Sequence, residues 1–226
     1  MTKVLIHTLV FAPDGVSNGY MYRDLAVELQ RRGHQVIVLT TYPHYNVIPE
    51  ELLKQPLTKR WGGLFATSSL GQVRVIHIPI FKKSAKRIVR IISAVWFNMA
   101  SLVIGAVVSG RSDIVFASSP PITSGLIGRL LGLIWGVPSA YIIQDIFPDS
   151  LIRQGKIQSK ALVSFLRKLE KKVYNVNDAV VVIAHSFVPT IRPRLRKSDN
   201  LHLIENFVDT ELYRPLPRQN DFSRKY

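Results

Sequence analysis

Apolar runs alternate along the chain with segments in which apolar residues recur every three or four positions. A short apolar run is typical of a buried strand, and the longer spacing is typical of a helix with one apolar face. Strands are predicted, in chain order, at residues 3–10, 34–41, 73–80, 113–119, 138–145, 179–184 and 201–206. The intervening patterns predict helices at residues 18–33, 87–109, 120–136, 159–175 and 186–196.

The strands predicted here are apolar on both faces and are separated by helices. That alternation is typical of a parallel sheet covered on both sides. We therefore predict an α/β fold with a doubly wound, mainly parallel, Rossmann-like sheet over residues 1–213. Gly33 fits a helix end, and Pro121 is acceptable in the first turn of its helix. Residues 214–226, rich in proline and polar residues, are predicted to be a linker. Ligands of such a sheet bind at the carboxyl ends of the strands, near the switch in strand order.

Charge is distributed unevenly over the 226 residues, which carry a net charge of +15 and contain no cysteine. Without cysteine, disulfides and cysteine-ligated metals are excluded. Residues 52–112 hold ten cations and no acidic residue. A field of one sign attracts nucleic acid, anionic lipid or a phosphorylated ligand. A solvated basic face is the alternative that the sequence leaves open.

An uncharged stretch at residues 93–110 follows the densest group of cations. These cations are Lys82, Lys83, Lys86, Arg87 and Arg90. The stretch is long enough to span a bilayer, but it lies between two strands of one predicted sheet, and spanning would separate them. We therefore predict a helix packed on the sheet with one face dipping into lipid, while the cations bind an anionic membrane surface.

The loop after the first predicted strand has the residues of a phosphate-binding turn. Gly15, Ser17, Asn18 and Gly19 open the following helix, and such a turn presents backbone N–H groups to an anion. It matches neither the dinucleotide-binding fingerprint nor a Walker A loop. A tight turn with Ser17 or Asn18 as the helix cap is the alternative interpretation.

Polar residues also stand at the ends of the second and fourth predicted strands. His44 and Tyr45 follow the second strand, and Ser118 and Ser119 end the fourth. All four are candidates for a ligand cleft at the carboxyl edge. His44 lacks partner ligands at a useful spacing, so no metal site is predicted. A capped helix start is the alternative interpretation of the two serines.

The fifth predicted strand ends in the sequence QDIFPDS, which carries two carboxylates. Asp145 lies where the sheet opens to its ligand, and it could orient a sugar hydroxyl or act as a base. Asp149 is a second cleft candidate. A core ion pair for Asp145 and a helix cap for Asp149 remain as alternatives.

Several motifs, in order along nearly all of the chain, resemble the N-terminal domain of retaining GT-B glycosyltransferases of family four. They are LAVELQRRGHQVIVLTTYPHYN, SDIVFASSPP, QDIFPDS, NDAVVVIAHSF and IENFVDTELYRP. The nearest resemblance is to the bacterial branch that builds surface polysaccharide and lipopolysaccharide O-antigen. Phe207 stands where the last motif of that family has glycine.

The resemblance implies that this chain is one half of a GT-B fold. The family holds its nucleotide-sugar donor in a second, C-terminal domain through two glutamates spaced eight apart, a pair that this sequence lacks. We therefore expect an incomplete enzyme, inactive alone, whose partner domain is supplied in cis or in trans. Glu205, Asn206 and Asp209 would form the interdomain hinge.

The resemblance also implies roles for the candidate residues. The loop of Gly15, Ser17, Asn18 and Gly19 would approach the donor diphosphate, and Asp145 would act in catalysis. The enzyme would transfer a sugar, with retention, from a nucleotide-sugar to a lipid-linked or oligosaccharide acceptor. It would need no metal or other cofactor, and it would work in the cytoplasm on the inner face of the cell membrane.

Two other functions are alternatives to this hypothesis. A non-catalytic module that binds nucleic acid or anionic lipid fits the net charge of +15, but the basic segment lacks the interleaved aromatic residues that stack on bases. Nucleic acid is therefore disfavoured as a partner. A nucleotide-dependent oxidoreductase is disfavoured because Thr40 and Thr41 end the second strand where an acidic residue is needed.

Overall fold

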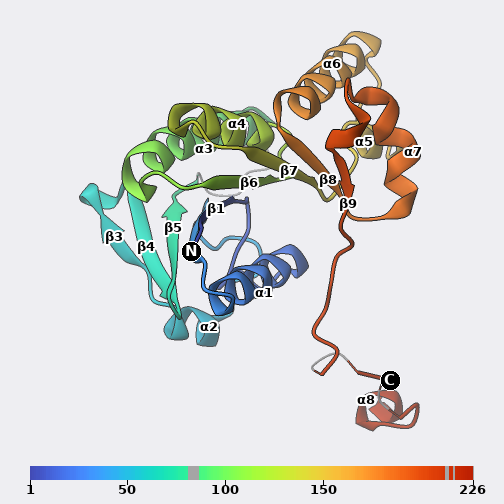
Figure 1. The fold of residues 1–226 in the computed structure, drawn as a ribbon. Helices are drawn as coiled ribbons and strands as arrows, with labels where there is room; N and C mark the ends of the chain where they lie inside the picture. Colours follow the sequence, from blue (N-terminus) through green and yellow to red (C-terminus); the bar gives the residue numbers. More distant parts are fainter. Residues whose placement is uncertain (81–86, 212–213, 216, 226) are drawn as a thin grey trace.

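The computed structural model describes residues 1–80, 87–211, 214–215 and 217–225, which form one mixed sheet flanked by helices (Figure 1). The strands stand in the order β3-β4-β5-β2-β1-β6-β7-β8-β9. Their bounds are β1 (Lys3–His7), β2 (Gln35–Thr41), β3 (Thr58–Arg60), β4 (Phe65–Leu70), β5 (Val73–Ile78), β6 (Ile114–Ser118), β7 (Ser139–Ile143), β8 (Ala179–Val182) and β9 (Leu201–Leu203). Each predicted strand is present, and the predicted fold class is confirmed.

The sheet is parallel from β5 to β9, and its strand order reverses at β1. From β1 the chain first builds outward through β2 and β5, and it then returns to place β6, β7, β8 and β9 on the other side. The carboxyl ends of β1 and β6 therefore lie side by side at the switch point. Ligands of doubly wound sheets bind at this place.

Strands β3 and β4, which add an antiparallel edge to the predicted strand β5, are the main elements that the apolar pattern did not predict. Strand β4 has the sequence FATSSL, in which three polar residues interrupt the apolar run. Ser68 is nevertheless buried there, because its hydroxyl is 2.8 Å from His77 Nε2 and accepts a 2.8 Å hydrogen bond from Gln55. Hydrogen bonds among buried polar side chains, rather than an apolar run in the sequence, therefore accompany the burial of this strand.

Helices cover both faces of the sheet, as the right-handed crossovers of parallel strands require. Helix α1 lies on one side, whereas α3, α4 and α6 lie together on the other (Figure 1). The helices are α1 (Ser17–Arg31), α2 (Pro49–Lys54), α3 (Arg87–Ile104), α4 (Ser124–Trp135), α5 (Asp149–Arg153), α6 (Lys160–Val176), α7 (Val188–Ile191) and α8 (Asp221–Lys225). Short 3-10 turns occur at Trp61–Gly63, His185–Phe187, Arg192–Arg194 and Ser198–Asn200.

The helices differ from the prediction in several details. Helices α2 and α5 were not predicted, and the helix predicted at residues 186–196 is the short α7 between two 3-10 turns. Helix α4 begins at Ser124, so Pro121 precedes it rather than standing in its first turn. Helix α3 ends in a turn of π-helix at Gly105–Ser109. The tail predicted as a linker contains α8, which lies apart from the sheet in Figure 1. The division into residues 1–213 and 214–226 remains a prediction.

The core lies in layers between the sheet and its helices. Phe97, Ala100 and Ile104 of α3 pack on the side chains of β2 and β5. Helix α4 lies close to its neighbours because it carries glycines at the contact. A Cβ atom on Gly125 would stand 2.5 Å from Val173 of α6, too close for any side chain to fit without a shift. This tight layer fixes the three helices on one face of the sheet.

Candidate functional site

A hollow of about 190 Å³ lies at the carboxyl edge of the sheet, where β1 and β6 meet. It is lined by Thr8, Leu9, Val10, Val16, Ser17, Asn18, Tyr45, Ser119 and Pro120. Four of these lining residues are predicted site residues, and they come from three separate loops: Ser17, Asn18, Tyr45 and Ser119. The structure therefore brings together four of the ten residues that the sequence predicted for the loop and the cleft.

The N-terminus of α1 opens into this hollow. The helix begins at Ser17, its N-cap residue is Val16, and no side chain caps it. Its first backbone N–H groups have no acceptor within the helix, and the helix dipole places partial positive charge there. Such an end accommodates a phosphate or carboxylate group. The interpretation of Ser17 or Asn18 as the capping residue is therefore wrong.

Asp14 fixes the loop that precedes this helix, and sequence analysis missed it. Its carboxylate is 2% exposed and accepts backbone hydrogen bonds from His44 (2.9 Å), Tyr45 (3.0 Å) and Asn46 (2.7 Å). The loops after β1 and β2 are thereby held against each other. Because the three donors lie about thirty residues away in the chain, no local pattern could have identified them.

Gly15 and Gly19 lie behind the hollow rather than in its lining. The amide of Gly15 donates to the carbonyl of Asn46 (2.8 Å), and the side-chain amide of Asn46 donates to the Gly15 carbonyl (2.9 Å). At Gly19 a Cβ atom would stand 2.7 Å from the carbonyl oxygen of Asp14. These two glycines therefore shape the loop so that Ser17 and Asn18 face the hollow.

His44 supports Tyr45 and does not line the hollow. Its Nδ1 lies 2.9 Å from the carbonyl oxygen of Tyr42 and 3.1 Å from the hydroxyl of Thr41. Its ring packs on Tyr45 with a centroid distance of 4.4 Å. Within the described residues no group of three potential ligands could hold a metal ion. That no cofactor is needed stays a prediction.

The two predicted serines have different positions. The hydroxyl of Ser118 donates to Thr8 Oγ1 (3.0 Å) and joins β6 to β1, so it is buried behind the hollow. Ser119 lines the hollow, and its hydroxyl accepts a hydrogen bond from the backbone N–H of Gln144 (2.9 Å). This bond ties the loop after β7 to the rim of the hollow.

Gln144, which sequence analysis did not single out, connects the rim to α1 and to the predicted hinge. Its side-chain amide donates to the hydroxyl of Tyr22 (3.2 Å) and lies 3.7 Å from the sulfur of Met21 on α1. Burial raises the pKa of Tyr22 to about 12, so this hydroxyl stays protonated at neutral pH. Gln144 also exchanges two hydrogen bonds with Asn206, of 3.0 and 3.3 Å.

The two carboxylates of the QDIFPDS motif lie in different surroundings. Asp145 is exposed at the end of β7, beside Gln144, and within the described part of the chain it makes no ion pair. Asp149 does not line the hollow, because it pairs with Arg194 and with Arg167 (3.3 Å). Desolvation opposes its ionisation, but these two guanidinium groups outweigh that effect and hold the pKa of Asp149 below its usual range.

Residues 19–206 match the family described as Glycosyl transferase 4-like domain. The chain belongs to this family. The glycosyltransferase domain is 24% identical over 115 residues to the probable glycosyltransferase WbjE of Pseudomonas aeruginosa. That alignment covers 49% of this chain and 28% of WbjE.

Solved structures share the fold of the glycosyltransferase domain. Sucrose-phosphate synthase from Thermosynechococcus elongatus gives a TM-score of 0.62 at 12% identity, over 96% of this chain and 51% of the synthase. Starch synthase IV from Arabidopsis thaliana, bound to ADP and acarbose, gives a TM-score of 0.62 at 12% identity, over 93% of this chain and 52% of the synthase. Anabaena HepE in complex with UDP and glucose gives a TM-score of 0.57 at 12% identity, over 96% of this chain and 48% of HepE.

The glycosyltransferase domain thus spans about half the length of the solved structures that it matches. At 12% identity the likeness shows the fold alone. The domain has the α/β fold of one half of a GT-B glycosyltransferase. This agreement confirms the family and the fold half expected from the sequence motifs.

The predicted hinge and membrane residues of the glycosyltransferase domain are described in part. Asn206 is bound to Gln144, the carboxylate of Asp209 accepts the backbone N–H of Glu211 (2.9 Å), and Glu205 is exposed. The cations Lys82, Lys83 and Lys86 lie outside the described residues, as do the side chains of Arg87 and Arg90. Their predicted roles stay predictions.

Proposed function

We propose that this domain is the acceptor-binding half of a retaining glycosyltransferase that acts in cell-surface polysaccharide biosynthesis. The enzyme moves a sugar from a nucleotide-sugar donor to a lipid-linked or oligosaccharide acceptor. Membership of the glycosyltransferase 4-like family and the likeness to WbjE support this proposal. A second domain, in cis or in trans, would carry the donor site, since the chain spans about half of the GT-B structures that it matches.

The uncapped N-terminus of α1 in the hollow is the observation that carries the proposal. During transfer the bond between the anomeric carbon and the diphosphate oxygen breaks, and the acceptor hydroxyl forms the new bond on the same face of the sugar. The leaving diphosphate needs N–H donors and positive charge. The backbone at Ser17 and Asn18 supplies such donors, and Tyr45 and Ser119 also line the hollow.

Asp145 is the catalytic candidate in this proposal because it is exposed at the same edge of the sheet. Gln144, its neighbour, is bound to Ser119 in the lining of the hollow. A carboxylate in this position orients the acceptor hydroxyl or takes its proton. The bond between Gln144 and Asn206 couples this loop to the segment that would lead to the donor domain.

We expect the purified chain to bind a soluble lipid-linked sugar, such as a farnesyl-diphosphate-linked monosaccharide, and to release no nucleoside diphosphate from nucleotide-sugars. Ser17→Leu places a larger apolar side chain in the hollow at an exposed position, where it would obstruct the acceptor beside the leaving diphosphate, so it should weaken binding about tenfold, or about 1.4 kcal/mol. Ser198→Leu, at an exposed serine away from the hollow, is the matched control. Microscale thermophoresis measures both affinities.

Two results would contradict the proposal. Release of nucleoside diphosphate by the chain alone would place the donor site within these residues. Binding of duplex DNA at physiological salt, with no binding of the lipid-linked sugar, would favour the non-catalytic basic module instead.

A further inference from the structure

The outer side of α3 and its π-helical turn carries a row of apolar side chains that the fold leaves exposed. Their spacing of three or four residues places them on one side of the helix. More than half of each side chain is exposed: Ile92 (52%), Val95 (57%), Met99 (53%), Val103 (57%) and Val107 (65%). A helix of a water-exposed layer normally shows polar residues there, so this row is unusual.

Helix α4 extends the row, because it packs beside α3 on the same side of the sheet (Figure 1). Leu130, Leu133 and Ile134 of α4 are also exposed, by 42 to 58%. Neither helix contains a carboxylate, and the cation of α4, Arg129, is paired with Asp178 at 2.7 Å. We call the eight exposed residues of α3, its π-turn and α4 the α3–α4 apolar face.

The opposite side of α3 is fixed to the sheet and cannot leave it. Phe97 and Ile104 are 1% and 2% exposed and belong to the core. Trp96 donates through its indole N–H to the carbonyl of Pro79 (2.8 Å). The segment Ile92–Ser109 is long and apolar enough to cross a membrane, with a mean hydropathy of 1.8. Because its inner side builds the core, it can meet lipid only with its outer side.

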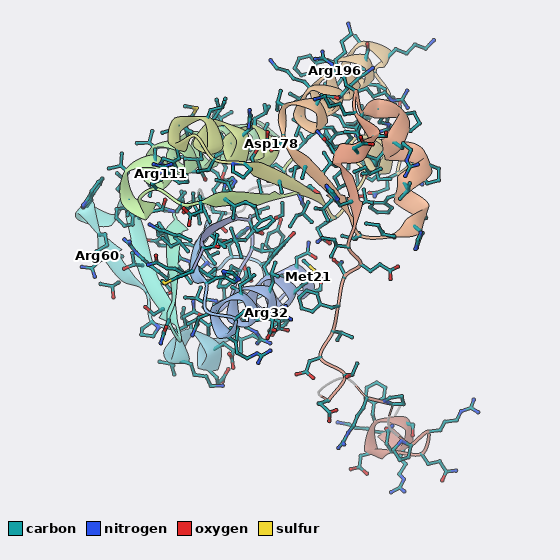
Figure 2. All side chains as sticks on the ribbon, viewed as in Figure 1. Met21, Arg32, Arg60, Arg111, Asp178 and Arg196 are labelled. Carbon is teal, nitrogen blue, oxygen red and sulfur yellow. The ribbon has the colours of Figure 1, made fainter. Side chains whose placement is uncertain are left out.

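Cations also lie on the side of the sheet that carries the α3–α4 apolar face (Figure 1). Lys168, Lys171 and Lys172 of α6 are exposed, and so is the aromatic ring of Phe165 (62%). Figure 2 shows Arg111 beyond the end of α3 and Arg196 beside α6. A side of a protein that combines an exposed apolar surface with lysine, arginine and an exposed aromatic ring is typical of proteins that lie in the interface of an anionic bilayer.

We propose that the α3–α4 apolar face inserts into the interfacial layer of an anionic lipid bilayer. A second copy of the chain is disfavoured as the occupant, because each copy carries a net charge of +15 and the two would repel. A following domain is disfavoured because the chain beyond β9 leaves on the other side of the molecule from α3 and α4 (Figure 1). The face lies apart from the hollow, so this proposal and the proposed function can fail separately.

The test is flotation of the purified chain with vesicles of phosphatidylcholine, with and without roughly one phosphatidylglycerol in three lipids. The wild-type chain should float with the anionic vesicles. The double variant Val95→Glu/Val103→Glu should lower the partition coefficient at least about tenfold, because two carboxylates would enter the interface. Circular dichroism verifies that both exposed positions tolerate the change.

The matched control is Val27→Glu/Leu53→Glu, which alters two exposed apolar residues of α1 and α2 by the same charge. Its partition coefficient should stay within about twofold of the wild-type value. Flotation of Val95→Glu/Val103→Glu equal to that of this control would overturn the proposal, since charge alone would then explain binding. Absence of wild-type flotation, or a wild-type dimer that the Val95→Glu/Val103→Glu change dissociates, would overturn it as well.

A second readout uses the absence of native cysteine. An environment-sensitive dye is attached to the cysteine of the Met99→Cys variant. Its fluorescence emission should shift to the blue with anionic vesicles, and spin-labelled lipid should quench it. The same dye at Val27→Cys should keep its emission in water. Equal spectra at the two positions with vesicles present would contradict insertion through this face.

Discussion

Acidification from pH 7 to pH 4.5 should lower the free energy of unfolding by about 5 kcal/mol, because two buried histidines are held neutral in the fold. His7 is fully buried and stacks on Phe97, with ring centroids 5.4 Å apart. His77 is also buried, between the hydroxyl of Ser68 (2.8 Å) and the carbonyl of Thr41 (3.2 Å). Burial lowers the pKa of each imidazole from 6.5 to about 4.

The direction of the effect follows from these lowered pKa values. Above pH 6.5 the imidazoles are mostly neutral in both the folded and the unfolded chain, so their burial does not lower the free energy of unfolding. As the pH falls from 6.5 toward 4, the unfolded chain takes up protons that the folded chain does not, so stability is lost. Each pKa unit corresponds to about 1.4 kcal/mol.

Urea unfolding followed by circular dichroism between pH 7.5 and 4.5 measures this dependence. The variant His77→Gln keeps a hydrogen-bonding side chain and should remove about half of the pH slope. His202→Gln, at an exposed position on β9, should leave the slope unchanged. An unfolding free energy that stays constant over this range would show that the two imidazoles are not buried as described.

Arg194→Ala should cost about 3–5 kcal/mol of stability, because it leaves a buried carboxylate without its cation. Arg194 bonds both carboxylate oxygens of Glu170, at 2.6 and 2.7 Å, and it also pairs with Asp149. Glu170 is 1% exposed, and burial raises its pKa above the usual range against the opposing effects of Tyr174 and Arg194. Without Arg194, the hydroxyl of Tyr174 (2.8 Å) remains as its partner.

The urea midpoint at pH 7, measured with an unchanged m-value, gives the loss directly. Arg196→Ala, an exposed arginine two residues further on, should cost less than about 0.5 kcal/mol. The double variant Glu170→Gln/Arg194→Met should be more stable than Arg194→Ala, since it removes the buried charge together with its cation. Equal losses for Arg194→Ala and Arg196→Ala would contradict the ion network as a stabilising element.

The parallel part of the sheet could be predicted from sequence because its strands are apolar on both faces. The run VIVL at residues 36–39 is fully buried, as its composition indicates. Strand β4 could not be predicted in this way, because its burial depends on the hydrogen bonds of Ser68 with Gln55 and His77. Those partners are known only once the sheet has formed.

The site was predictable to the extent that strand ends are predictable. Ser17, Asn18, Tyr45 and Ser119 meet in one hollow because each follows a strand or opens a helix at the same edge. Residues that act through distant partners escaped the sequence pattern. Asp14 accepts hydrogen bonds from the loop after β2, and Gln144 forms hydrogen bonds with α1 and with Asn206.

Asp149 shows the opposite case, since its position in the motif suggested the cleft. Its partners are Arg194 and Arg167, which stand 45 and 18 residues further along the chain. Electrostatic networks of this kind perturb pKa values as active sites do. A carboxylate near a strand end therefore needs its contacts before it is assigned a role.

Amide chemical-shift mapping of the ¹⁵N-labelled chain tests the central claim most directly, with inorganic pyrophosphate and a farnesyl-diphosphate-linked monosaccharide as the probes. Both probes should shift the amides of Val16, Ser17, Asn18 and Gly19 most, and the sugar-bearing probe should also shift Tyr45 and Ser119. Shifts concentrated on the α6 lysines Lys168, Lys171 and Lys172, with none around the N-terminus of α1, would contradict the assignment of the hollow as the site of sugar transfer.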